Sequence, residues 1–170
     1  MDIAELILED HHEQRKMFAI LDEIPRGDTE KLTAVWQRLA ILLEVHAEAE
    51  EQLFYPRLLD AGQGALGHPP DDETSDAIHD HNEIRAAVRQ AGEHAVGTDA
   101  WWSAVLAARK ANSVHMGEEE REALADFRRH APLQLRHDLG LEFAAFEAAH
   151  ARGVPAQDKN PTRYLVEHGD

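Results

Sequence analysis

Residues 46–56 read HAEAEEQLFYP, a stretch that opens with an imidazole, carries a carboxylate four positions later and ends on a proline. In an α-helix, a spacing of four residues places His46 and Glu50 on one face about one turn apart, where both side chains can reach one cation. The same spacing recurs where His115 precedes Glu119 in HMGEE. One such pair is weak evidence, because most pairs of this kind lie in solvent, but two copies favour a metal site.

The residues around both pairs follow the period of amphipathic helices, with apolar side chains at steps of three and four. Proline, glycine and aspartate collect at the predicted breaks, which are residues 25–28, residues 62–72, residues 97–99 and the step before Pro132. Four long helices are therefore expected within residues 2–127, and a shorter fifth helix at about residues 132–151. Because short loops favour antiparallel neighbours, the predicted fold is all-α, an up-down-up-down four-helix bundle. Residues 1–153 form this one domain, and residues 154–170 are predicted to be a C-terminal tail without a helix.

Polar residues interrupt the apolar stripe of each long helix. They are His11 in the first helix, His46 and Glu50 in the second, His81 in the third, and His115 and Glu119 in the fourth. The second stripe continues beyond its polar pair to Leu53. At a rise of about 1.5 Å per residue, the polar positions of all four helices reach about the same depth in an antiparallel bundle. Imidazoles and carboxylates buried in one layer are costly to desolvate without a compensating cation, so this layer is predicted to bind metal.

The alternative for each histidine taken alone is a buried side chain satisfied by one hydrogen bond. Neighbouring residues are predicted to have supporting roles. Glu51 and Glu120 lie off the inward face and could orient an imidazole from behind. His12 lies on the flank of the first helix, and His79 lies two residues from His81, so both are second choices for such a role. No catalytic residue is assigned beyond the metal ligands.

The composition narrows the chemistry further. The 170 residues include 43% hydrophobic residues, enough for the core of one domain, and no cysteine, which excludes thiolate metal sites, iron–sulfur clusters and thiol nucleophiles. The net charge of -16, from 17 basic and 33 acidic side chains, repels phosphate backbones and anionic lipids, so neither nucleic acid nor a membrane is an expected partner. The 12 histidines favour a transition metal instead. Without an apolar run of signal or membrane-spanning length, the expected location is cytoplasmic.

Four stretches resemble the helices of the hemerythrin-like HHE cation-binding family: EDHHEQRKMF, HAEAEEQLFYP, HDHNEI and HMGEEEREAL. The resemblance spans roughly residues 2–127, and Pro56 stands where the family's second helix is typically kinked or ended. The resemblance implies a non-haem di-iron site, in which carboxylates and an oxo or hydroxo group bridge two iron ions. Carried over position by position, its ligands are His11, His46, Glu50, His81, His115 and Glu119.

The chain departs from the oxygen-carrying hemerythrins at two places. Ala77 stands where the carriers have a further histidine on the third helix, and the fourth helix has HxxxE where the carriers have a histidine and an aspartate. A site with one nitrogen fewer has room for a small oxidant, so the expected partners are hydrogen peroxide, O2 and nitric oxide. The favoured reaction is peroxide decomposition of the catalase or peroxidase type. Binding or sensing of O2, nitric oxide or iron without turnover, metal buffering, and a helical bundle without metal are the alternatives. Nitrogen and oxygen ligands also leave the choice between iron, manganese and zinc open.

Overall fold

The computed structural model describes residues 1–169 and folds most of them into helices. The helices are α1 (Ile3–Glu23), α2 (Thr29–Ala49), the π-helix η1 (Glu50–Phe54), α3 (Tyr55–Ala61), α4 (Pro70–Gly92), α5 (Asp99–Arg121), α6 (Ala123–His130), α7 (Leu133–Ala149) and α8 (Pro161–His168). Over residues 1–169 there is no β-strand, only an isolated bridge between Ala65 and His68. The prediction of an all-α fold is therefore confirmed. None of the described helices is both long and apolar enough to cross a membrane.

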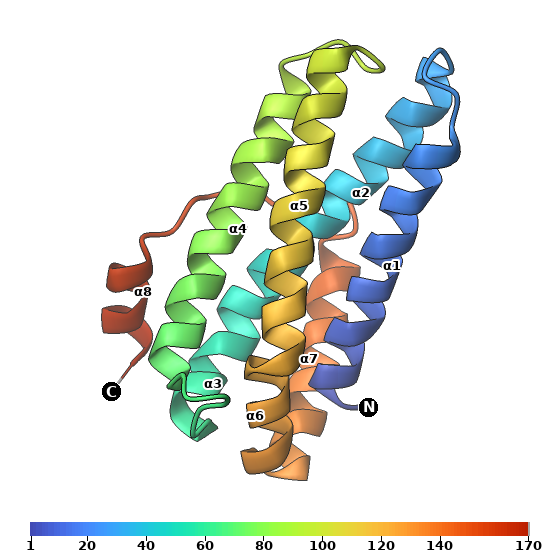
Figure 1. The fold of residues 1–170 in the computed structure, drawn as a ribbon. Helices are drawn as coiled ribbons and strands as arrows, with labels where there is room; N and C mark the ends of the chain where they lie inside the picture. Colours follow the sequence, from blue (N-terminus) through green and yellow to red (C-terminus); the bar gives the residue numbers. More distant parts are fainter. Residues whose placement is uncertain (170) are drawn as a thin grey trace.

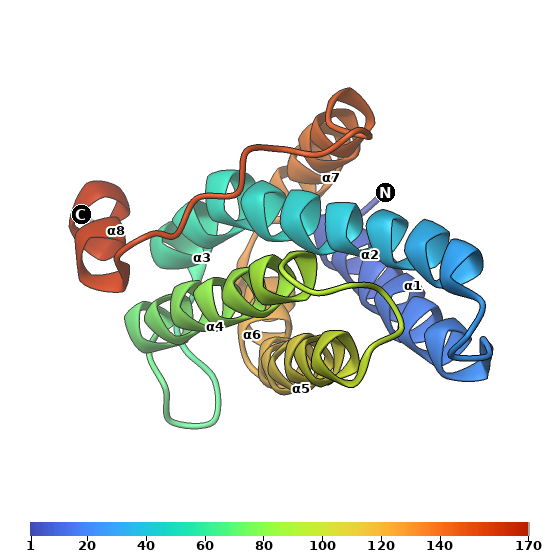
Figure 2. The ribbon, with the colours of Figure 1, turned by 90° about the horizontal axis from the view of Figure 1, so that it is seen from above.

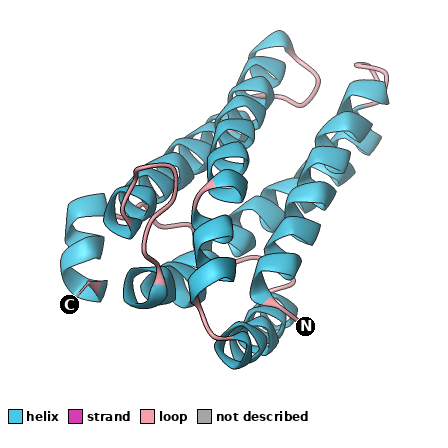
Figure 3. Ribbon diagram, turned by 60° about the horizontal axis from the view of Figure 1, so that its bottom comes forward, coloured by secondary structure: helices cyan, strands magenta, loops and turns pink. Residues whose placement is uncertain are grey.

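Helices α1, α2, α4 and α5, each of 21 to 23 residues, form the body of the molecule (Figure 1). The chain ascends in α1, returns in α2, ascends again in α4 and returns in α5. The loops that join these helices lie at the two ends of the bundle (Figure 3). Helix α1 packs on α2 and α4 packs on α5, and the view from above shows the two pairs side by side (Figure 2). Helix α7 packs on α1 and α2, and α8 packs on α4. This arrangement is consistent with a hemerythrin-like helical bundle.

Capping residues explain where the long helices begin. Asp2 and Asp28 precede α1 and α2, and their carboxylates accept hydrogen bonds from backbone N–H groups of the first turn. Thr98 caps α5 in the same way. Helix α4 begins with Pro70, whose missing N–H is no loss at the first helical position. The loop predicted at residues 62–72 therefore ends earlier than expected.

The second helix continues through its proline by changing its winding. After α2, the chain enters η1, where the N–H of Tyr55 bonds to the carbonyl of Glu50, five residues earlier. Helix α3 follows, with Pro56 in its first turn. Because Pro56 has no N–H to offer to the preceding turn, a change of hydrogen-bond pattern here is physically expected. The kink or end that the family resemblance implies at this point is a π-helical turn.

Buried apolar side chains form two clusters, one toward each end of the bundle. On α1, Ile7 belongs to the first cluster and Met17 to the second, and the buried polar residues His11 and Gln14 lie between them. Gln14 Oε1 accepts a hydrogen bond from Asn112 of α5 at 2.9 Å. A polar layer is thus enclosed between two apolar clusters, which keep water away from it.

The prediction of a tail without a helix is wrong. Residues Pro161–His168 form α8, and Asn160 caps it by accepting a hydrogen bond from the N–H of Arg163 at 2.9 Å. Asparagine before proline is a usual start of a helix, but the segment is short and mostly polar, so its pattern is weak. The fourth predicted helix is also interrupted, because the backbone of Glu122 leaves the helical region between α5 and α6.

Candidate metal centre

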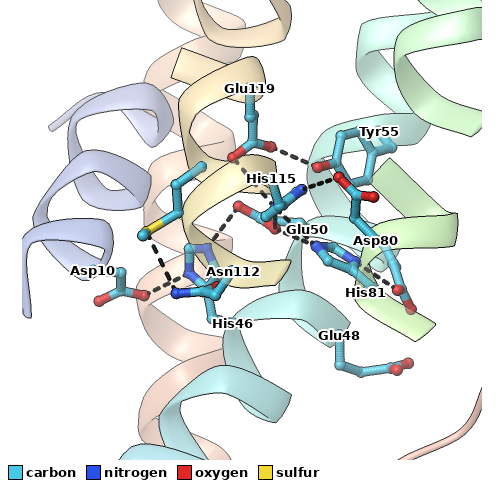
Figure 4. Close-up of polar contacts among 12 residues, drawn as sticks. Asp10, His46, Glu48, Glu50, Tyr55, Asp80, His81, Asn112, His115 and Glu119 are labelled. Atoms are coloured by element: carbon cyan, nitrogen blue, oxygen red, sulfur yellow. Dashed lines mark hydrogen bonds and ion pairs between the residues drawn. The ribbon is translucent and has the colours of Figure 1, made fainter. Parts of the chain in front are cut away.

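The polar layer brings six buried side chains together, and Figure 4 labels all of them except His11. They are the predicted ligands His11, His46, Glu50, His81, His115 and Glu119, and none is more than 4% exposed. The imidazoles come one each from α1, α2, α4 and α5, and the carboxylates come from η1 and α5. The constant rise of the helices places these positions, far apart in sequence, at one depth.

Four of these side chains form a first group: His11, His46, Glu50 and Glu119. Their candidate ligand atoms all lie within 4.8 Å of one another. His46 Nε2 lies 2.9 Å from Glu50 Oε1, and His11 Nε2 lies 3.2 Å from Glu119 Oε2. Both imidazoles therefore turn Nε2 toward the carboxylate oxygens at the centre of the layer.

A second group adjoins the first and consists of Glu50, His81 and His115, again with candidate ligand atoms within 4.8 Å of one another. His81 Nε2 lies 3.2 Å from Glu50 Oε2, the oxygen that does not face His46. His115 Nε2 lies 3.9 Å from Glu50 Oε2 and 3.9 Å from Glu119 Oε2. Glu50 is thus shared by the two groups, and Glu119 is close to histidines of both.

Several candidate metal-ligand atoms of the layer have no hydrogen-bond partner within the described part of the chain. They are Nε2 of His11, Nε2 of His46, both carboxylate oxygens of Glu50, and Oε2 of Glu119. Leaving a buried polar atom unpaired costs roughly 1–3 kcal/mol, and a proton or a metal cation among these atoms removes that cost. Imidazole nitrogens and carboxylate oxygens without thiolate fit a first-row transition metal. The residues present therefore fit a metal cation.

The two glutamates predicted to support the ligands lie behind imidazoles. His11 Nδ1 donates to Glu120 Oε1 at 2.9 Å, and His81 Nδ1 donates to Glu51 Oε1 at 2.7 Å. Such a bond keeps the proton on Nδ1 and leaves the lone pair of Nε2 for a metal. Each glutamate directly follows a ligand glutamate in the sequence and reaches across to a histidine of another helix.

An aspartate lies near Nδ1 of each of the other two imidazoles, and sequence reasoning missed both aspartates. His46 Nδ1 donates to Asp10 Oδ2 at 2.9 Å. Asp80 Oδ2 lies 3.9 Å from His115 Nδ1, too far for a direct hydrogen bond. Each aspartate directly precedes the ligand histidine of its own helix, and this adjacency is the signal that could have found it.

The two second-choice histidines lie outside the layer. His12 and His79 are both exposed. His79 Nε2 lies 3.5 Å from Glu83 Oε1, one turn further along α4, which is a surface ion pair of little energetic weight. The structure therefore does not bring either histidine to the metal centre.

The carboxylates control the charge of the buried imidazoles. Burial opposes a positive charge on His46, but Glu50 and Asp10 outweigh burial and raise the pKa of His46 well above its usual value. Burial likewise opposes a charge on His81, while Glu50 and Glu51 raise the pKa of His81 to about 9. Without metal, both imidazoles are therefore in the doubly protonated, positively charged form at neutral pH. A metal ion needs the neutral imidazole and must displace these protons.

The C-terminal segment reaches the site at Glu51. Arg85 Nη2 lies 2.9 Å from Glu51 Oε2, and Lys159 Nζ donates to the same oxygen. The hydroxyl of Tyr164 donates to the backbone carbonyl of Glu51. Asn82 holds the backbone of Lys159, donating to its carbonyl at 2.7 Å and accepting from its N–H at 3.0 Å. Sequence reasoning missed these contacts because no local pattern links residues so far apart in the chain.

A cavity of about 110 Å³ lies beside the second group and is lined by His115 and Glu119. Ala77, which stands in place of the carriers' histidine, and Tyr55 line it as well. The hydroxyl of Tyr55 donates to Glu119 Oε1 at 2.6 Å. Burial, with Glu119 and Glu50 nearby, raises the pKa of Tyr55 well above its usual value, so the phenol keeps its proton. Tyr55 was not predicted, because an uninterrupted α-helix would not turn it inward.

Comparison with known proteins identifies the family of this arrangement. No curated protein and no solved structure matches the chain. Residues 2–127 match the family described as the hemerythrin HHE cation binding domain. The matched region covers α1 to α5 and most of α6, and so contains all six candidate ligands. With its candidate cation ligands gathered in the matched region, the chain belongs to the hemerythrin HHE cation-binding domain family.

Proposed function

We propose that the chain is a non-haem di-iron protein that decomposes hydrogen peroxide. The observation that carries the proposal is the pair of adjoining ligand groups that share Glu50, together with the cavity beside His115 and Glu119. We infer as well that α1, α2 with α3, α4, and α5 with α6 are the four helices of an up-down-up-down bundle within residues 1–153. Residues 154–170 are then an addition to that domain.

In this proposal, His11 and His46 would hold one ion, His81 and His115 would hold the other, and Glu50 would be shared by the two groups. Glu119 is the second candidate bridge, because Oε2 lies near histidines of both groups. Two iron ions would supply and accept the two electrons by which one peroxide molecule is reduced to water and another is oxidised to O2. The sum, two H2O2 to two H2O and one O2, needs no further reductant.

The chain's own residues provide access and protons. The small side chain of Ala77 leaves space where a histidine would fill the cavity, so a molecule the size of peroxide can reach the second group. The Tyr55 hydroxyl, 2.6 Å from Glu119, holds a proton at the wall of the same cavity. The apolar clusters on both sides of the layer limit the approach of water along the axis of the bundle.

The test is metal analysis combined with peroxide consumption. Protein made in iron-rich medium should contain two iron ions per chain, and the rate of O2 release from added peroxide should rise in proportion to iron content. His115→Ala should lose iron and turnover together, whereas His12→Ala, on the exposed flank, is the matched control and should keep both. Zero or one tightly bound ion per chain would refute the di-metal proposal. Reversible O2 binding without peroxide consumption would favour a carrier or a sensor.

A further inference from the structure

The cavity beside the metal centre has acidic walls. Six carboxylates line it: Glu73, Asp76, Asp80, Glu118, Glu119 and Glu122. Among the described residues that line it, none is a lysine or an arginine. Helices α4 and α5 each contribute three or more of the lining side chains, at steps of three and four residues, which is the spacing of one helix face. Two helices therefore turn acidic faces toward a shared space.

Glu73 is the lining residue whose burial most needs an explanation. It is 7% exposed, and its Oε1 accepts a hydrogen bond from the N–H of Ala65 at 3.1 Å. Its Oε2 is buried and finds no hydrogen-bond partner in residues 1–169. Burial, with Asp126 and Glu122 nearby, raises the pKa of Glu73 to about 7. A buried carboxylate oxygen without a donor is costly unless a proton or a metal cation binds to it.

The carboxylates extend from the surface to the metal ligands. Asp76 and Glu118 are exposed. Glu122 is partly buried, and its Oε2 lies 3.0 Å from Nδ1 of His68 in the loop between α3 and α4. At the buried end stands Glu119, a candidate metal ligand whose Oε2 also lacks a partner. The cavity thus joins solvent to the ligand set through a series of negative charges.

We propose that this cavity takes up the divalent cation that loads the metal centre, with Glu73 as a transient oxygen ligand on the path. Negative charges in a low-dielectric cleft concentrate cations and raise their association rate. Carboxylate oxygens alone hold a divalent ion weakly enough to release it to the imidazoles beyond. A neutral molecule such as peroxide gains nothing from this charge, so the acidic walls point to a cation. The inference rests on the proposed metal centre as the destination.

The experiment follows the rate at which metal-free protein takes up Co²⁺, whose visible absorption reports nitrogen and oxygen coordination. The triple variant Glu73→Gln, Glu118→Gln, Glu122→Gln removes charge from the path while keeping the shape of the side chains. The matched control is Glu23→Gln, Glu30→Gln, Glu93→Gln, three exposed glutamates that do not line the cavity. At a pH well above 7, where Glu73 is ionised, both triples remove three negative charges, so a difference between them reports position.

The path variant should load about tenfold more slowly than the wild type, with a weaker dependence on salt, and should reach the same final number of ions. The control should stay within about twofold of the wild type. Glu73→Gln alone should slow loading measurably, which guards against misfolding of the triple variant. Equal loading rates in the two triples, with full occupancy in both, would overturn this inference and leave the proposed function intact. A wild-type protein that takes up no metal would overturn both.

Discussion

Replacing Lys159 by methionine should weaken the half of the metal centre that contains His81. Lys159 Nζ contacts the carboxylates of Glu48 and Glu51, and the Glu51 carboxylate is buried and accepts the hydrogen bond of His81. Methionine keeps much of the length of the side chain and removes only the charge. The His81 imidazole would then donate its hydrogen bond to a Glu51 carboxylate that has lost the Lys159 ammonium and keeps the Arg85 guanidinium.

The size of the effect follows from the burial of the two partners. The side chain of Lys159 is 25% exposed, and that of Glu51 is fully buried. An exposed ion pair contributes about 0–1 kcal/mol, and removal of one partner from a fully buried pair costs about 3–5 kcal/mol. Because Arg85 remains, we expect a loss of about 1–2 kcal/mol in the unfolding free energy. Disturbing the carboxylate behind a ligand histidine costs about 10–100-fold in metal affinity, and the less direct change at Lys159 should cost about tenfold.

Urea unfolding of the metal-free protein and competition for the metal with a chelator measure the two quantities. Arg163→Met is the matched control, because this change removes a charge from α8, and within residues 1–169 Arg163 pairs only with the exposed Glu167. It should change stability by less than about 0.5 kcal/mol and leave metal affinity unchanged. Lys159→Arg should restore most of both losses. If Lys159→Met and Arg163→Met behave alike in both assays, the C-terminal segment plays no part in holding His81.

Four further predictions concern the metal centre itself. Metal binding at pH 7 should release protons, and the affinity for metal should increase as pH rises toward 9, because His46 and His81 have raised pKa values and must lose a proton to bind metal. A titration with metal in weak buffer measures the released acid, and no release would contradict this prediction. For the same reason, the contribution of His81 to the stability of the metal-free protein is complete below about pH 6.5 and is lost as pH rises through about 9, which urea unfolding at several pH values should show. Ala77→His should fill the cavity and slow O2 release from peroxide at unchanged iron content, and equal rates would argue that the substrate does not use this space. Tyr55→Phe should destabilise the metal-free protein by about 1–3 kcal/mol, because Glu119 Oε1 loses its donor; a smaller change in urea unfolding would mean that water replaces the hydroxyl.

The position of the six candidate ligands could be predicted from sequence because it depends on one regular quantity. The rise per residue of a helix is nearly constant, so counting residues from the loops places His11 and His81 at one depth. The same counting places His115 there from the opposite direction. No interaction energy was needed for this step, only the assumption that neighbouring helices are antiparallel.

The remaining features depend on contacts between residues far apart in sequence. The side chain of Asn82 and the backbone of Lys159 meet through two hydrogen bonds that have no periodic signal. The cavity beside Ala77 depends on how α4 and α5 pack, and an alanine in a helix says nothing about whether a neighbour fills the space above it. Helix α8 is held by contacts to α4 and through Tyr164 to Glu51, and its own sequence pattern is weak.

The π-helix explains why the inward-facing stripe predicted for the second helix is wrong beyond Glu50. An α-helical count from Glu50 leads to Leu53, but the structure leaves Leu53 only partly buried and fully buries Phe54 and Tyr55. The five-residue step from the N–H of Tyr55 to the carbonyl of Glu50 inserts one residue into the turn and shifts every later inward position by one. This shift brings the hydroxyl of Tyr55 to Glu119 across the bundle. The change of winding before Pro56 therefore places a proton donor against a candidate bridging carboxylate, which an uninterrupted α-helix would not do.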